Sequence, residues 1–220
     1  MAYLYFLGAT LFVALAVAVV MLRSAHAHMR ELAMTDELTG LANRRAMIAQ
    51  LEALLTDPDT AQLSLLIIDI DYFKLINDRH GHHSGDLALR CVAAMLRTAT
   101  PEAALVARQG GEEFVVVLPA AALDEARALA EQLRQRIALL DSEQWQGIDG
   151  MTASIGVTVS PAHGELPDDL LRRADNALYA AKHDGRNCVR LVLPSTTSAA
   201  PVQEELPGFR RPEHRAAQRR

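Results

Sequence analysis

Two adjacent carboxylates follow a pair of glycines near the middle of the chain. Glu112 and Glu113 come directly after Gly110 and Gly111, between the short apolar runs 103–107 and 114–118. Two β-prone runs joined through Gly-Gly predict a hairpin over residues 103–118 with a tight turn. A turn without side chains lets a bulky anion approach the backbone. In a strand the two glutamates would point to opposite faces, so that one can meet a ligand.

A second pair of carboxylates ends a continuous apolar run. Residues 63–71 predict a strand buried on both faces, which finishes in Asp69, Ile70 and Asp71. Because side chains alternate along a strand, Asp69 and Asp71 share one face at its C-terminal end. Carboxylates and backbone carbonyls are ligands that suit hard cations such as Mg²⁺.

A polar stretch follows this strand. Residues 72–86 carry Lys74, Asn77, His82 and Asp86 among several glycines and histidines. Turn and cap chemistry is the simpler explanation for Asn77 and Asp86 taken alone. Three histidines in this stretch suggest a metal, but no second ligand cluster at zinc spacing accompanies them, which favours surface or substrate contacts.

Taken together and in order, these motifs resemble the GGDEF family of diguanylate cyclases over nearly all of residues 34–194. The resemblance rests on the opening DELTGLANRR of residues 36–45, DIDYFK and IND of 69–78, GGEEF of 110–114, SIGV of 154–157, and the closing pattern of 174–187. It implies an α+β domain, with a mixed, largely antiparallel sheet flanked by helices, as in nucleotidyl cyclase and polymerase palm domains.

The resemblance also implies an enzyme that condenses two GTP into cyclic di-GMP and two pyrophosphates with Mg²⁺, or alternatively Mn²⁺. Asp69, the carbonyl of Ile70 and Glu112 would hold the metal. Glu112 would also help to deprotonate the attacking 3′-hydroxyl, although a metal-bound oxygen could serve as the base instead. Lys74 would steady the charge that develops in the reaction.

Substrate contacts follow from the same resemblance. Asn77 and Asp86 would read the guanine, and His82 would help to seat the base or ribose. The remaining contacts would go to the phosphates, from the backbone near Phe73, from the turn glycines Gly110 and Gly111, and from Lys182 and Arg186. Lys182 and Arg186 are four residues apart and would share a helix face if the helix continues that far.

One domain binds one GTP, so the expected working unit is a symmetric homodimer. A non-catalytic effector that binds GTP or cyclic di-GMP on the same fold is the alternative, and degenerate members lose the acid after Gly-Gly or the strand-end aspartate. Both acids are present here. The Arg-x-x-Asp motif that binds inhibitory product in many members would occupy positions 101 and 104, which are Pro101 and Ala104. We therefore expect weak or no allosteric inhibition.

The N-terminal segment has a different character. Residues 3–22 carry no charge, and as a helix they would span about 30 Å, the thickness of a bilayer core. We expect residues 1–22 to be a retained anchor in contact with lipid. A cleaved signal peptide is the rival, but no Lys or Arg precedes the apolar run. Arg23 and Arg30 place the rest in the cytoplasm, on a single-pass protein of the inner membrane.

The remaining organisation is simple. We expect a short linker at 23–33, the catalytic domain at 34–194 and a disordered tail at 195–220. Helices are predicted at 43–55, 87–98, 123–140 and from 167 to near 184, with strands at 151–159 and 187–193. Cys91 and Cys188 show no zinc spacing and fit a reducing compartment. The formal net charge of −5 argues against nucleic acid as a partner.

Overall fold

The computed structural model describes residues 12, 15–23, 29, 34–140, 150–160 and 165–194. The predicted linker lies largely outside these residues, and the predicted tail lies wholly outside them. Of the predicted anchor, residues 12 and 15–22 are described and are helical. Within the described part of the chain, no helix is both long and apolar enough to cross a membrane.

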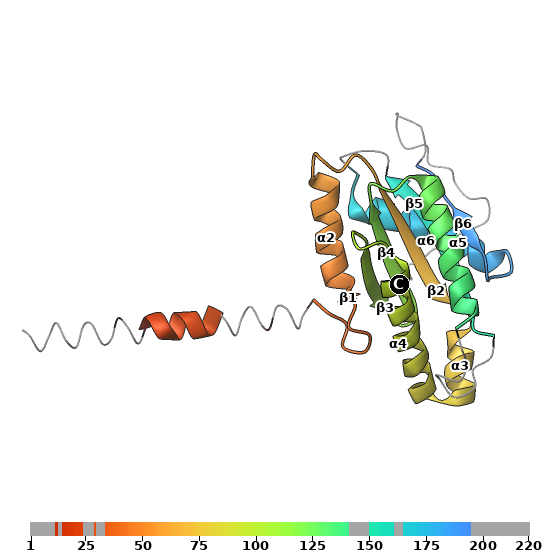
Figure 1. The fold of residues 1–220 in the computed structure, drawn as a ribbon, viewed down its shortest axis with the longest axis horizontal. Helices are drawn as coiled ribbons and strands as arrows, with labels where there is room; N and C mark the ends of the chain where they lie inside the picture. The colour runs from red at the N-terminus through yellow and green to blue at the C-terminus, as the bar shows by residue number, and fades with distance from the viewer. Residues whose placement is uncertain are drawn as a thin grey trace, which may run out of the picture.

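Among the described residues, six strands form one mixed sheet in the order β1-β3-β4-β2-β5-β6 (Figure 1). Their bounds are β1 Ala42–Asn43, β2 Leu63–Ile70, β3 Leu105–Gly110, β4 Glu113–Pro119, β5 Ala153–Ser160 and β6 Val189–Leu191. The three central pairings are antiparallel, whereas both edge strands pair in parallel. The predicted mixed, largely antiparallel sheet is confirmed.

Helices cover both faces of this sheet (Figure 1). On one face, α2 (Arg44–Thr56) and α6 (Pro167–His183) pack on the odd-numbered residues of β2. On the other face, α3 (Phe73–His80), α4 (His82–Ala99) and α5 (Leu123–Ala138) cover the even-numbered residues. Every residue of β2 is buried, as its continuous apolar run predicts.

Two glycines allow close contacts between neighbouring elements. A Cβ atom at Gly156 would lie 2.3 Å from Ala174 O and 2.3 Å from Leu178 N, which are backbone atoms of α6. Only glycine allows α6 to lie so close to β5. A Cβ atom at Gly85 in α4 would lie 1.9 Å from the Oδ1 atom of Asn77 in α3.

The polar stretch 72–86 differs from the prediction. No helix was predicted here before residue 87, but α3 begins at Phe73 and α4 begins at His82, five residues before the expected start. Gly81, with φ of 82°, separates the two. Phe73 and Ile76 of α3 are buried in the same core cluster as Leu89 of α4, so core packing overrides the polar composition of this stretch.

Candidate active site

The C-terminal end of β2 brings the predicted acids together. Asp69 lies directly opposite Glu113 in the register of β2 and β4. The amide of Ile70 donates to the carbonyl oxygen of Glu112 at 3.4 Å, which fastens the glycine turn to the end of this strand. Glu112 itself lies in the turn and β4 begins at Glu113, so the predicted alternation along one strand does not apply to this pair.

Asp69 is a buried carboxylate with one cationic partner. Its side chain is 8% exposed, and its Oδ2 atom lies 2.8 Å from the Nζ atom of Lys182. Burial raises the pKa of Asp69, the Lys182 ammonium opposes this increase, and the nearby carboxylates of Glu112 and Asp71 add to it. Because three carboxylates lie near one another here, a cation such as the Lys182 ammonium is favoured beside Asp69.

Asp71 has a different environment from Asp69, because β2 ends at Ile70, one residue short of the predicted end, and Asp71 lies beyond the strand. Its Oδ1 atom accepts from Ser154 Oγ at 2.6 Å, and its Oδ2 atom accepts from Thr152 Oγ1 at 2.7 Å. The backbone amide of Asn187 also donates to Oδ2 at 3.0 Å. These bonds tie the end of β2 to β5 and to the segment after α6. Both carboxylate oxygens of Asp71 thus accept hydrogen bonds from other parts of the chain, and the sequence pattern did not predict these bonds.

Lys182 and Arg186 both reach the site, but not from one helix face. α6 ends at His183, and Arg186 lies beyond it with a positive φ of 65°. The Arg186 guanidinium lies over the ring of Tyr72 at 4.5 Å from its centroid. Tyr72 has φ of 55°, is 62% exposed and precedes α3. Two cations thus flank the segment that leads into α3, where the predicted phosphate contacts begin.

The predicted base-recognition residues lie on α3 and α4. Asn77 and Asp86 are half-buried, and neither side chain forms a hydrogen bond or ion pair with another described residue. Partly buried polar groups without protein partners are ready to bind a ligand. Lys74 and His82 are exposed at the beginnings of α3 and α4, whereas the Phe73 side chain belongs to the core.

The glycine turn is held by an ion pair that the motifs alone do not predict. Arg108 donates from Nε and Nη2 to the carbonyl oxygen of Gly111, at 3.0 and 2.7 Å. Its Nη1 atom lies 3.0 Å from Asp36 Oδ1. Gly110 and Gly111 have φ of 151° and 54°, and Gln109 is the extra residue of a bulge in β3. Only glycine tolerates this pair of conformations easily.

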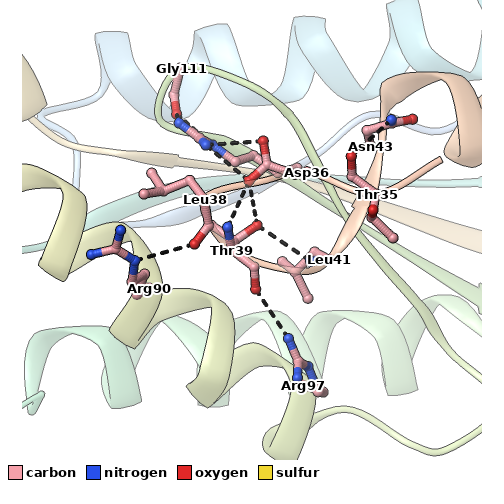
Figure 2. A network of polar contacts seen from close by, with 10 residues as sticks. Thr35, Asp36, Leu38, Thr39, Leu41, Asn43, Arg90, Arg97 and Gly111 are labelled. Atoms are coloured by element: carbon pink, nitrogen blue, oxygen red, sulfur yellow. Dashed lines mark hydrogen bonds and ion pairs between the residues drawn. The ribbon is translucent and has the colours of Figure 1, made fainter. Parts of the chain in front are cut away.

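Figure 2 shows how the opening motif supports this ion pair. Asp36 accepts from the amide and the hydroxyl of Thr39 at 2.9 and 2.6 Å. Arg90 and Arg97 of α4 approach the same loop and donate to the carbonyl oxygens of Leu38 and Thr39 (Figure 2). The loop that contains Asp36 and Thr39 is therefore held by Arg108 from β3 and by Arg90 and Arg97 from α4. A groove of about 740 Å³ borders the turn between α2 and β3, and Gly110 is the only predicted site residue that lines it.

The chemistry of the donor set fits a hard divalent cation. Two carboxylates and the carbonyl of Ile70 are oxygen ligands, and the Lys182 ammonium already occupies a cation's place beside Asp69. Among the described residues, no three His, Cys, Asp or Glu side chains gather into a metal-binding group. The predicted ligands include only two such side chains, Asp69 and Glu112, together with the carbonyl of Ile70. A group of three is therefore not required, and the metal assignment stays a prediction.

Comparison with known proteins gives the class and then the family. The mixed sheet flanked by helices places the chain among α+β domains. The family described as "Diguanylate cyclase, GGDEF domain" matches residues 33–188. The chain belongs to this family.

Relatives and solved structures agree with this assignment. The response regulator PleD of Caulobacter vibrioides is 43% identical over 176 residues, which cover 76% of this chain but 38% of PleD. Diguanylate cyclase DgcP of Pseudomonas aeruginosa is 41% identical over 170 residues, covering 75% of this chain and 25% of DgcP. The coiled coil and GGDEF domain of DgcB from Caulobacter crescentus, solved with c-di-GMP, is 30% identical with a TM-score of 0.72, and the match covers 81% of this chain and 95% of that one.

Proposed function

We propose that the protein is a diguanylate cyclase that condenses two GTP into cyclic di-GMP and two pyrophosphates. The observation that carries this proposal is the pairing of Asp69 with Lys182 beside the turn that holds Glu112. Family membership supports it, as does the name of the relative diguanylate cyclase DgcP.

The acids would hold a divalent cation, Mg²⁺ or alternatively Mn²⁺, through Asp69, the carbonyl of Ile70 and Glu112. When bound, the cation supplies charge neutralisation at the phosphates and activation of the hydroxyl. Lys182 then exchanges its contact with Asp69 for the β and γ phosphates, which Arg186 also contacts. Lys74 and the amides at the start of α3 stabilise the charge on the phosphoryl group.

Glu112 has a second role in this proposal. It accepts the proton of the attacking 3′-hydroxyl, because the turn presents its carboxylate beside the strand end where the α-phosphate would lie. Gly110 and Gly111 leave room for that phosphate. Asn77 and Asp86 select guanine, since a base with the wrong donors would leave these half-buried groups unpaired. His82 contacts the base or the ribose.

The reaction requires a symmetric dimer, because each domain presents one set of these residues and the product joins two nucleotides. The expected consequence is a specific activity that rises with protein concentration. A specific activity that is independent of concentration in a demonstrably monomeric sample would contradict the dimer.

The N-terminal segment would anchor this dimer in the inner membrane, with the catalytic domain in the cytoplasm. In support, the apolar side chains described between residues 12 and 22 are exposed, including Phe12, Leu15 and Leu22. The full chain should remain with membranes after carbonate extraction. Recovery of soluble protein that begins near residue 28 would instead establish a cleaved signal peptide.

The test of the activity itself is incubation of the purified full chain with GTP and Mg²⁺, followed by chromatographic identification of the products. Cyclic di-GMP and pyrophosphate in a ratio of one to two support the enzyme. Tight binding of GTP without turnover would favour the non-catalytic effector.

A further inference from the structure

Gly85 lies inside α4 although nothing in its backbone conformation requires glycine. α4 runs from His82 to Ala99, and Gly85 is absent from the glycines with positive φ. Glycine within a helix is less stable than alanine. Glycine at position 85 therefore lowers the stability of α4 relative to alanine, and the backbone conformation gives no reason for it.

Space is the explanation. A Cβ atom at Gly85 would lie 1.9 Å from the Oδ1 atom of Asn77, 3.0 Å from its Cγ atom and 3.2 Å from Phe73 Cζ. The first distance is far shorter than any tolerated contact. Asn77 is half-buried and its side chain has no hydrogen-bond partner among the described residues, so its carboxamide keeps its observed position only while position 85 has no side chain.

We propose that Gly85 is a positioning residue for base recognition, which acts by leaving the space in which the Asn77 carboxamide faces the purine. This inference rests on the proposed function only in assuming that the ligand is a guanine nucleotide. Any side chain at position 85 displaces Asn77 while Asp86, the next residue, keeps its place on α4. One contact to the base is lost and the other is retained.

Gly85→Ala tests the inference in the full chain. We expect the dissociation constant for GTP to rise about fivefold or more, as for the loss of one hydrogen bond. The preference for GTP over ATP should fall in parallel. The KM should change more than kcat, because Asp69 and Glu112 are untouched. Asn77→Ala should have the same effects as Gly85→Ala.

The double variant Asn77→Ala/Gly85→Ala distinguishes positioning from general packing. If Gly85 acts through Asn77, the double variant binds GTP as weakly as either single variant, and its Tm is not below that of Asn77→Ala. If Gly85 merely keeps α3 against α4, the losses multiply. Phe73→Leu in the Gly85→Ala background relieves the contact at Phe73 and should not restore binding.

GTP binding and cyclic di-GMP formation are measured on the same samples, so that failure of the proposed activity can be told apart from failure of the proposed role of Gly85. Wild-type protein that binds GTP and makes no cyclic di-GMP would overturn the enzyme while leaving the role of Gly85 open to the same binding test. Unchanged GTP affinity in a folded Gly85→Ala protein, multiplying losses in the double variant, or restoration by Phe73→Leu would overturn the inference.

Discussion

Arg108 joins Asp36, 72 residues earlier in the chain, to the glycine turn that carries Glu112. One guanidinium makes both contacts, with Asp36 through Nη1 and with the Gly111 carbonyl through Nε and Nη2. The Arg108 and Asp36 side chains are 13% and 23% exposed. The opening motif of the domain thereby sets the position of a candidate catalytic residue that it does not itself contact.

Asp36→Asn should reduce turnover with little change in the fold. Without a charged partner Arg108 holds Gly111 less firmly, and a displacement of about 1 Å at a reacting group can cost on the order of a hundredfold in rate. We expect kcat to fall about tenfold or more. Arg97→Gln is the matched control, because Arg97 donates to the same loop at Thr39 and does not contact the turn. Equal kcat in Asp36→Asn and wild type would show that the ion pair does not position the turn.

The same pair predicts a pH dependence of stability. Burial would raise the pKa of Asp36, but hydrogen bonds from Thr39 and Arg108 lower it below its ordinary value of 3.8. A lowered folded-state pKa gives a stabilisation that is complete above the unfolded pKa and lost as pH falls through the folded pKa. Urea unfolding of wild type and Asp36→Asn should differ by a constant amount from about pH 8 to about 5, and the difference should shrink below about pH 4. A difference that grows on acidification would contradict this account.

Asp69 and Asp71 should respond oppositely to the same substitution. The pKa of Asp69 is raised, so its ionised form opposes folding above that pKa. Asp69→Asn should therefore leave the free energy of unfolding at pH 7.5 unchanged or higher. It should abolish turnover, because Asp69 is a proposed ligand of the divalent cation. Asp71→Asn places an amide NH₂ where donors point, and should lower that free energy by about 1–3 kcal/mol. Chemical unfolding of the two variants side by side checks both. Greater destabilisation by Asp69→Asn than by Asp71→Asn would reverse the two roles.

Much of the fold follows from local patterns. The buried strand, the hairpin and four helices were predicted at or near their observed positions, because apolar periodicity and caps such as Asn43, whose Oδ1 accepts from Ala46 N at 3.1 Å, act locally. The two-residue β1 is too short for any periodicity. The helix α3 and the early start of α4 escaped prediction, since their Asn, Asp, Gly and His residues suit loops until Phe73 and Ile76 are buried.

The site was predictable in its residue types but not in its contacts. The motifs single out the acids Asp69 and Glu112, the cations Lys182 and Arg186, and the pair Asn77 and Asp86, whose role in base recognition stays a prediction. The ion pair of Lys182 with Asp69 joins residues far apart in sequence, as does that of Arg108 with Asp36. No local signal distinguishes the hydrogen-bonded Asp71 from Asp69, because alternation along a continuous strand would place both on one face, whereas β2 ends at Ile70 and Asp71 lies beyond it. Those distinctions arise only when β2, β5 and α6 pack together.

Product inhibition should be weak apart from competition for the active site. Pro101 is exposed and Ala104 half-buried, and both line a cavity of about 380 Å³. Neither side chain can make charge-assisted contacts with a dianionic ligand. Progress curves with added cyclic di-GMP at several GTP concentrations should show inhibition that GTP overcomes. Noncompetitive inhibition at low micromolar product would imply another regulatory site.

The comparison of wild type with Glu112→Gln tests the central claim most directly. Both proteins are incubated with GTP and Mg²⁺ at matched concentration, and cyclic di-GMP is quantified. Glu102→Gln, which changes an exposed acid outside the turn, is the control. We predict product from wild type and from the control, and none from a folded Glu112→Gln protein. Near wild-type product formation by folded Glu112→Gln would contradict the assignment of this turn as the catalytic centre.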